Sequence, residues 1–232
     1  MKECSIDNIK YDYKLFIGSS HTWALTQILN NFTNKNDSIL DIGSSIGMMG
    51  NLLKNHGFSN LDAVEINENA RNIASKYYNT MYDDLSKVNK KYDLLLLLDV
   101  LEHTVDHKEF FKEVISKLNK NGILLLSVPN IAHWYTRFSL LFGNFNYTEK
   151  GILDNTHLHF FTRKTIINFV NSFNGIKIES INASTSPIEM FISKKIRKSF
   201  LYKIFAIIKY KWVNLFPRIL GYQHLLVIRK ND

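Results

Sequence analysis

Several acidic side chains stand at the ends of short apolar runs, where they could accept hydrogen bonds from a ligand. They are Asp41, Glu65, Asp83, Asp84 and Asp99. Asp41 precedes the run 43–47, which begins and ends with glycine and has serine between. Small residues let the backbone pass close to a ligand, and a helix that follows such a turn points free N–H groups into the same space. The pattern predicts a site for a nucleotide-type ligand.

The glycine-rich turn favours a cationic ligand over a phosphate. If Gly47 and Gly50 take the last two glycine positions of the dinucleotide fingerprint G-x-G-x-x-G, the first position falls on Ser45. A side chain fits poorly there, and the negative charge of Asp41 repels phosphate. S-adenosylmethionine carries an ammonium, a sulfonium and a carboxylate but no phosphate. Asp41 suits its cationic end, and the helix N-terminus after Gly43, Ser44 and Gly47 suits its carboxylate.

Two further acidic positions suit the rest of the same cofactor. Glu65 can accept hydrogen bonds from both ribose hydroxyls. Asp83 or Asp84 could accept one from the adenine amino group. The succession of acids along the chain therefore predicts S-adenosylmethionine as the cofactor.

The elements that must position these residues alternate along the chain. Apolar runs predict strands at 38–42, 60–66, 80–85, 92–99, 122–128, 176–181 and 225–229. Helical patterns start at Thr22 and continue at 47–54, 68–78, 106–119 and 162–173. This alternation predicts an α/β fold with a parallel sheet, whose ligands lie outside the carboxyl ends of the strands.

Three stretches carry a family resemblance. The runs 39–47, 92–103 and 121–130 resemble the first motif, the strand-four motif and strand five of the class I S-adenosylmethionine-dependent methyltransferases. Ser45 departs from the family pattern, where many members have glycine. The resemblance implies a Rossmann-like sheet of seven mostly parallel strands, with helices on both faces and an antiparallel last strand. It also implies that cofactor contacts come from Asp41, Gly43, Ser44, Gly47, Glu65, Ile66, Asp83, Asp84, Asp99 and Val100.

The chemistry of methyl transfer leaves little for the protein to do beyond positioning and desolvation, because the sulfonium is already activated. A hydroxyl acceptor would gain from a general base. His157 and His103 are the candidates that the fold would bring nearest the methyl group; a structural or substrate-orienting role is the alternative. Substrate contacts are expected from Asn130, Trp134, Tyr135 and His159.

A metal centre is a competing interpretation of the same region. Glu102, His103, His107, His157 and His159 could form a cluster of oxygen and nitrogen ligands. No complete metal-binding spacing is present, so no metal is predicted.

The positive charge is concentrated in one segment. Of the formal net charge of +8, residues 191–220 carry eight cationic side chains and no acid, so the rest of the chain is neutral overall. No nucleic-acid partner is therefore expected for the main domain. Apolar residues recur at helical spacing through the segment, which predicts an amphipathic helix on an anionic membrane. The alternatives are a lid helix and the face of a homodimer.

The predicted organisation is one domain with two additions. Residues 1–36 would form an N-terminal cover, or a flap that touches the ligand through Tyr13 or His21. Residues 37–190 and 221–232 would form the methyltransferase domain. Residues 191–220 would form a basic amphipathic insertion. With Cys4 as the single cysteine, and no apolar run at the N-terminus, a cytoplasmic protein is expected, peripheral to the membrane if the basic segment binds lipid.

The predicted function is methylation of an oxygen, or less readily a nitrogen, on a small or glycan-type acceptor. The run 154–162 is similar to a segment of bacterial methyltransferases found among surface-polysaccharide genes, which favours a sugar or cell-surface glycan precursor. A non-catalytic S-adenosylmethionine-binding subunit that activates a partner is one alternative. An NAD-dependent oxidoreductase is another, and Asp41 and Ser45 argue against it.

Overall fold

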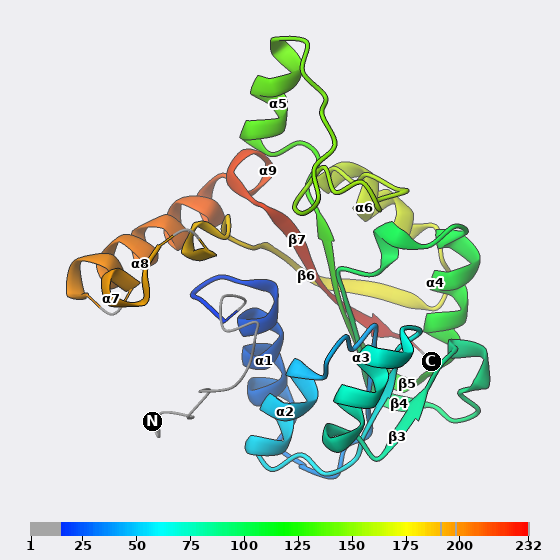
Figure 1. The fold of residues 1–232 in the computed structure, drawn as a ribbon. Helices are drawn as coiled ribbons and strands as arrows, with labels where there is room; N and C mark the ends of the chain where they lie inside the picture. Colours follow the sequence, from blue (N-terminus) through cyan, green and yellow to red (C-terminus); the bar gives the residue numbers. More distant parts are fainter. Residues whose placement is uncertain (1–14, 191, 198, 232) are drawn as a thin grey trace.

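The sheet has seven strands in the order β3-β2-β1-β4-β5-β7-β6 (Figure 1). The computed structural model describes residues 15–190, 192–197 and 199–231. Its strands are β1 (Ile39–Ile42), β2 (Leu61–Val64), β3 (Thr80–Tyr82), β4 (Tyr92–Leu98), β5 (Leu118–Pro129), β6 (Ile176–Ala183) and β7 (Gln223–Lys230). Strands β1 to β5 pair in parallel, and β7 lies antiparallel between β5 and β6. The predicted sheet with an antiparallel last strand is confirmed.

Helices cover both faces of this sheet (Figure 1). The α-helices of the described residues are α1 (Ser20–Asn31), α2 (Met48–Asn55), α3 (Glu68–Ala74), α4 (His107–Ser116), α5 (Trp134–Leu141), α6 (Arg163–Asn171), α7 (Lys194–Arg197), α8 (Phe200–Leu215) and α9 (Pro217–Leu220). Leu95 and Leu97 of β4 pack in the core that contains α4 and α6. Leu94 and Leu96 pack in the core that contains α1 and α2. Alternate side chains of one apolar strand thus supply two cores, as expected for a strand buried on both faces.

The register brings the strand ends together. Ile42 at the end of β1 pairs with Val64 of β2 and with Leu97 of β4. The residues that follow these strands therefore share one edge of the sheet. The acids at Glu65 and Asp99 lie at this edge together with the turn after Asp41.

The boundary between α4 and β5 differs from the sequence prediction. The helix was expected to run to Asn119 and the strand to begin at Gly122, but the helix ends at Ser116 and the strand begins at Leu118. The backbone N–H of Tyr92 donates to the Lys117 carbonyl (2.8 Å), and Asn119 donates to Asp93 (2.7 Å). These contacts across to β4 extend the strand backwards through a register shift.

The basic segment is not one helix. It contains α7, α8 and α9, and α8 projects to the left of the sheet in Figure 1. Among the side chains of α8, Ala206 and Val213 are buried. Lys209 and Tyr202 both contact Glu189 through hydrogen bonds of 2.7 Å and 2.6 Å, which fix α8 to the turn that precedes it. Among the described residues, no helix is long and apolar enough to cross a membrane.

Candidate active site

The turn after β1 lines a small cleft of about 150 Å³ together with Asp41, Asp99 and His21. Gly43 and Gly47 both have positive φ (77° and 82°), which favours glycine. A β-carbon on Gly43 would also collide with Val100. The two glycines thus allow the conformation of this turn. Ser45, where the sequence departs from the family pattern, also has a positive φ (50°), although it is not a glycine.

Asp41 is buried beneath this turn and is held by a tyrosine. The Tyr78 hydroxyl donates to Asp41 Oδ2 and accepts from the Gly50 backbone N–H (2.9 Å). Burial raises the pKa of Asp41 to about 6; the Tyr78 hydrogen bond opposes this increase, and the nearby Glu65 adds to it. Ionisation of this buried carboxyl costs free energy when no cation is nearby. A cationic ligand would lower that cost, so the site favours such a ligand.

Glu65 has its two carboxylate oxygens aligned by backbone groups. Oε2 accepts from the Ser45 N–H (2.7 Å) and Oε1 from the Asn67 N–H (2.9 Å). Each oxygen keeps a second lone pair, which suits the two hydroxyls of a ribose. The next residue, Ile66, is 82% exposed and offers an apolar surface beside it.

Asp83 and Asp84 follow β3 at the same edge of the sheet. Lys87 donates to Asp83 (2.7 Å), and this hydrogen bond lowers the pKa of the carboxyl. Asp84 accepts from the Ser86 N–H (2.7 Å), and its side-chain bond with Ser86 lowers the Asp84 pKa. Both groups are exposed, ionised acceptors.

Asp99 separates the cleft from a second, larger space. Its φ of +59° is unusual for a residue other than glycine. Its Oδ1 accepts from the Ser127 hydroxyl and from the Gln223 amide, both at 2.6 Å. These two bonds, from β5 and β7, hold the strained residue at the end of β4.

The larger cavity has a volume of about 370 Å³ and shares Asp99 and His21 with the cleft. We call it the acceptor cavity. Its other walls come from the segment before α1, the turn after β4, the loop 150–157 and the region between β6 and β7. Those walls include Phe16, Ser19, Ser20, Glu102, His103, Pro129, Lys150, Gly151, Asp154, His157, Thr185, Pro187, Tyr222 and Gln223.

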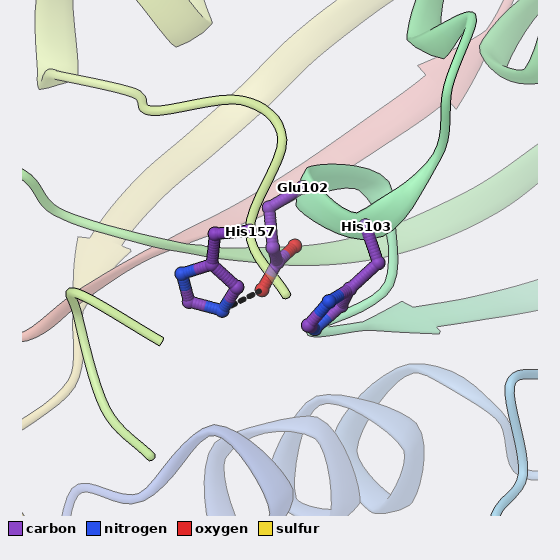
Figure 2. A group of neighbouring side chains, drawn as sticks. All are labelled: Glu102, His103 and His157. Atoms are coloured by element: carbon purple, nitrogen blue, oxygen red, sulfur yellow. Dashed lines mark ion pairs between the residues drawn. The ribbon is translucent and has the colours of Figure 1, made fainter. Parts of the chain in front are cut away.

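Figure 2 shows the side chains of Glu102, His103 and His157 converging in this cavity. Glu102 is fully buried, and neither of its carboxylate oxygens accepts a hydrogen bond from a described residue. Burial raises its pKa well above the usual range. His157 Nε2 lies 4.0 Å from Glu102 Oε1, too far for a hydrogen bond. The backbone N–H groups of Leu158 and His159 donate to the Glu102 carbonyl and fix the loop that carries His157.

Both histidines direct one nitrogen into the cavity wall. His157 Nδ1 lies 3.1 Å from the Ile152 carbonyl, and His103 Nδ1 lies 3.2 Å from the Thr156 carbonyl. A carbonyl oxygen can only accept a hydrogen bond, so each Nδ1 carries the ring hydrogen and each Nε2 keeps its lone pair. Burial lowers the pKa of His157, which keeps it neutral near pH 7. His157 Nε2 can therefore accept a proton from a group in the cavity.

The same three side chains offer donors to a metal ion. One donor atom from each of Glu102, His103 and His157 lies within 4.8 Å of the others. Two imidazoles and a carboxylate suit zinc and related divalent metals. Of the wider cluster considered from the sequence, His107 and His159 lie apart from these three: their ring centroids are 3.8 Å apart with the planes tilted by 40°, and His159 Nε2 contacts the Thr104 carbonyl.

Four predicted substrate residues do not line the acceptor cavity. Asn130 is fully buried; its amide donates to the Gly221 carbonyl and its Oδ1 accepts from the Ala132 N–H, so it ties β5 to the chain before β7. Trp134 and Tyr135 are exposed on α5, and His159 turns towards α4. The expected contact from Tyr13 lies outside the described residues. His21 lines both the cleft and the cavity; the flap alternative stays a prediction.

Sequence reasoning missed three residues that shape the site. Tyr78 holds Asp41. Tyr222, just before β7, and Gln223, the first residue of β7, line the acceptor cavity. For Tyr78 one sign was available: Gly50 stands inside a helix, and any β-carbon there would collide with the Tyr78 ring. Tyr222 and Gln223 reach the site through the order of the strands, which no local pattern reveals.

Comparisons with known proteins place these features in context. Residues 21–174 match a family described as a methyltransferase domain. The ubiquinone biosynthesis O-methyltransferase of Rickettsia bellii is 25% identical over 118 residues, which is 47% of this chain and 49% of that protein. The protein of the same name in Pelagibacter ubique is 33% identical over 104 residues, covering 41% and 43%. The chain spans about half the length of the curated relatives it matches.

Two solved structures show the same fold. Magnesium protoporphyrin IX methyltransferase (ChlM) from Synechocystis PCC 6803, solved with bound SAH, superposes with a TM-score of 0.62 at 16% identity, covering 91% of this chain and 82% of that one. The plantazolicin methyltransferase BpumL in complex with SAH gives 0.59 at 18% identity, covering 97% and 87%.

Proposed function

Because the chain belongs to the methyltransferase-domain family and has the class I S-adenosylmethionine-dependent fold, we propose that it transfers a methyl group from S-adenosylmethionine to a hydroxyl oxygen. The acceptor is a small molecule or a glycan-type precursor. The cofactor occupies the cleft lined by Asp41 and reaches Glu65, which is hydrogen-bonded to the cleft residue Ser45, and the acceptor occupies the adjoining cavity.

One observation carries this proposal: the acceptor cavity opens beside the cofactor cleft and contains a histidine with a free nitrogen. Asp99 and His21 belong to both spaces. His157 Nε2 faces the acceptor cavity while Nδ1 is engaged by the Ile152 carbonyl. A methyl donor in the cleft and a hydroxyl in the acceptor cavity can thus lie next to each other, with His157 Nε2 as the proton acceptor.

The transfer is an in-line displacement. The acceptor oxygen forms a bond to the methyl carbon as the bond from that carbon to sulfur breaks, and the sulfur keeps the electron pair. The hydroxyl proton moves to His157 Nε2. The products are the methyl ether, neutral S-adenosylhomocysteine and a protonated imidazole that returns its proton to solvent. Glu102, 4.0 Å away, would stabilise that imidazolium only in its ionised form, which burial of the carboxyl opposes.

Oxygen is favoured as the acceptor atom for two reasons. The curated relatives named above are O-methyltransferases by name. A hydroxyl also needs the general base that the cavity provides, whereas an uncharged amine is already a nucleophile. The resemblance of residues 154–162 to a segment of polysaccharide-associated enzymes supports a sugar-type acceptor, and the ubiquinone relatives support a phenolic one.

Turnover by the purified chain tests the proposal. Release of S-adenosylhomocysteine is measured with phenolic, sugar and lipid-linked hydroxyl acceptors. We expect His157→Ala to lower kcat by about 100-fold or more without changing cofactor affinity, and His56→Ala, at an exposed position, to match the wild type. Cofactor binding without turnover on any acceptor class would favour the non-catalytic subunit instead.

A chelator separates the base from the metal alternative. If His157 acts as a base, activity survives treatment with EDTA and dialysis. Loss of activity that zinc or manganese restores would overturn the base role and assign Glu102, His103 and His157 to a metal.

We also propose that α8 contacts an anionic membrane. Phe200, Leu201 and Leu215 are at least two-thirds exposed on this helix. Lys203 and Lys211 are exposed beside them, and the segment 191–220 contains no acid. Apolar side chains flanked by lysines suit the interface of an anionic bilayer. Such a contact would place the enzyme near an acceptor carried on lipid.

A further inference from the structure

A third space, of about 360 Å³, lies between α5, α6 and α9. We call it the α6 pocket. It is lined by Ala132, Arg137, Thr162, Arg163, Lys164, Ile167, Asn168 and Arg218. None of these residues lines the acceptor cavity or the cofactor cleft. The pocket is therefore a separate space, and the proposed methyl transfer makes no use of it.

The residues that line the α6 pocket carry positive charges that no lining acid neutralises. Four of its eight lining residues are arginine or lysine, and none is acidic. Among the described residues, no carboxylate forms an ion pair with Arg137, Arg163, Lys164 or Arg218. Cations gathered around one cavity repel each other, and an anion in the cavity relieves that repulsion.

Among these cations, Arg163 has the least favourable surroundings for its charge. Its Nη2 donates to the Ile181 carbonyl (2.8 Å), which fixes the guanidinium, but its buried Nη1 has no hydrogen-bond partner among the described residues. Burial lowers the pKa of Arg163, and the charge of Arg218 lowers it further. A buried donor without an acceptor is uncommon in a native structure and indicates a ligand that accepts from it.

Neighbouring groups orient the other donors. Arg137 Nε donates to the Ala132 carbonyl (2.6 Å), which leaves its two Nη groups for a ligand. The Asn130 amide donates to the Arg218 carbonyl (3.3 Å) and so anchors α9 beside the pocket. Thr162 caps α6 by accepting from the Thr165 N–H (3.2 Å), so the first turn of this helix, with its positive dipole end, forms part of the wall.

We infer that the α6 pocket binds a phosphate-bearing group, with Arg137, Arg163, Lys164 and Arg218 as its cationic contacts. Guanidinium groups match the geometry of phosphate oxygens through paired donors, and two or more of them suit a doubly charged group. The volume exceeds that of one phosphate, since a single water occupies about 30 Å³ of liquid. A diphosphate, alone or attached to a nucleoside or a lipid, is the class that fits.

Calorimetry with inorganic pyrophosphate at low and at physiological salt tests this inference, without any methyl donor. Lys164→Gln combined with Arg218→Gln removes two of the four charges at positions where neither side chain forms a described hydrogen bond. We expect this variant to bind pyrophosphate at least about tenfold more weakly. Lys91→Gln combined with Lys108→Gln, two exposed positions outside both the pocket and α8, is the control of equal charge and should bind like the wild type.

A second arm identifies the source of the phosphate. Co-sedimentation is measured with phosphatidic acid vesicles and with phosphatidylcholine vesicles. Pyrophosphate binding that the pocket variant loses assigns a soluble phosphate group. Binding confined to phosphatidic acid vesicles, and lost in the same variant, assigns a lipid headgroup. Equal losses in the pocket and control variants, or no phosphate-dependent binding in either arm, would overturn the inference. Cofactor binding is measured on the same samples, so failure of the pocket and failure of the proposed methyl transfer remain distinguishable.

Discussion

At the residue scale, the side chain with the most to explain is Asp41, because its position costs stability. A carboxyl whose pKa rises from 3.8 to about 6 on folding binds its proton more tightly in the folded state. The folded state therefore loses stability as pH rises from about 4 to about 6, and stays level above that. The total is about 3 kcal/mol. A bound ammonium recovers part of this cost.

The pH dependence of cofactor binding follows from this. Below pH 6 Asp41 is protonated, so we expect the affinity for S-adenosylmethionine to fall by about tenfold between pH 7 and pH 5. Tyr78, whose pKa burial raises, stays neutral throughout. His21 and Asp99 are the other titratable groups that line the cleft, and Glu65 lies near Asp41. Asp41→Asn should remove the pH dependence, weaken binding at pH 7 and stabilise the free protein, as calorimetry and denaturant unfolding would measure. A profile unchanged in this variant would contradict the role of Asp41.

Glu65 gives a second prediction at this scale. Glu65→Ala removes the acceptor for the ribose and releases the N–H groups of Ser45 and Asn67. We expect affinity for S-adenosylhomocysteine to fall about tenfold or more, since hydrogen bonds to a charged group contribute about 1.5–3 kcal/mol each. Glu68→Ala, at the first position of α3, is the control. Unchanged calorimetric affinity in a folded Glu65→Ala protein would remove this residue from the site.

At the scale of elements, helix α2 contains Gly50, although glycine is unfavourable inside a helix. Replacing a glycine inside a helix by alanine normally stabilises the helix by about 1 kcal/mol. At Gly50 a β-carbon would collide with the ring of Tyr78, whose hydroxyl joins the Gly50 N–H to Asp41. We therefore expect Gly50→Ala to destabilise the protein and to weaken cofactor binding, in thermal unfolding and calorimetry. Leu52→Met in the same helix, at a position that does not line the cleft, serves as a conservative control. A stabilised Gly50→Ala protein would show that the tyrosine moves freely.

Helix α8 gives the other prediction at this scale. Phe200 and Leu201 are 75% and 78% exposed, so replacing both with serine should leave the fold intact. Partitioning onto anionic vesicles should fall by about tenfold or more, since each buried apolar side chain contributes about 1.5–3 kcal/mol. Ile73→Ser, at an exposed position of α3, is the control. High salt should weaken wild-type binding; binding insensitive to both salt and the serine variant would reject the membrane contact.

At the scale of the whole molecule, the sequence predicted the donor half better than the acceptor half. Strand periodicity and the glycine turn locate Asp41, Gly43 and Glu65, because each lies within a few residues of the element that positions it. The sheet and its antiparallel last strand followed from the family resemblance and are confirmed. The boundary of β5 was wrong because contacts with β4 override the local helical pattern at Lys117 and Asn119.

The acceptor half is assembled from distant parts of the chain, and this limits what local patterns can reveal. Glu102 and His157 come together because a loop folds back on the turn after β4. Tyr222 and Gln223 join them because β7 inserts between β5 and β6. Trp134 and Tyr135, by contrast, follow β5 directly in sequence but project away on α5.

The position of β7 has a consequence for how this molecule can diversify. The chain leaves β6 and re-enters β7 at neighbouring points, where Ser184 and Tyr222 are joined by a backbone hydrogen bond of 2.9 Å. The segment between them, which includes α7 to α9, is an excursion of the chain whose two ends are held together by this hydrogen bond. Such an excursion can be lengthened, shortened or exchanged at little entropic cost to the sheet. Thr185 and Pro187 belong both to that excursion and to the acceptor cavity. If the proposed function holds, we expect changes in the excursion to alter acceptor preference without altering the residues proposed to bind the methyl donor.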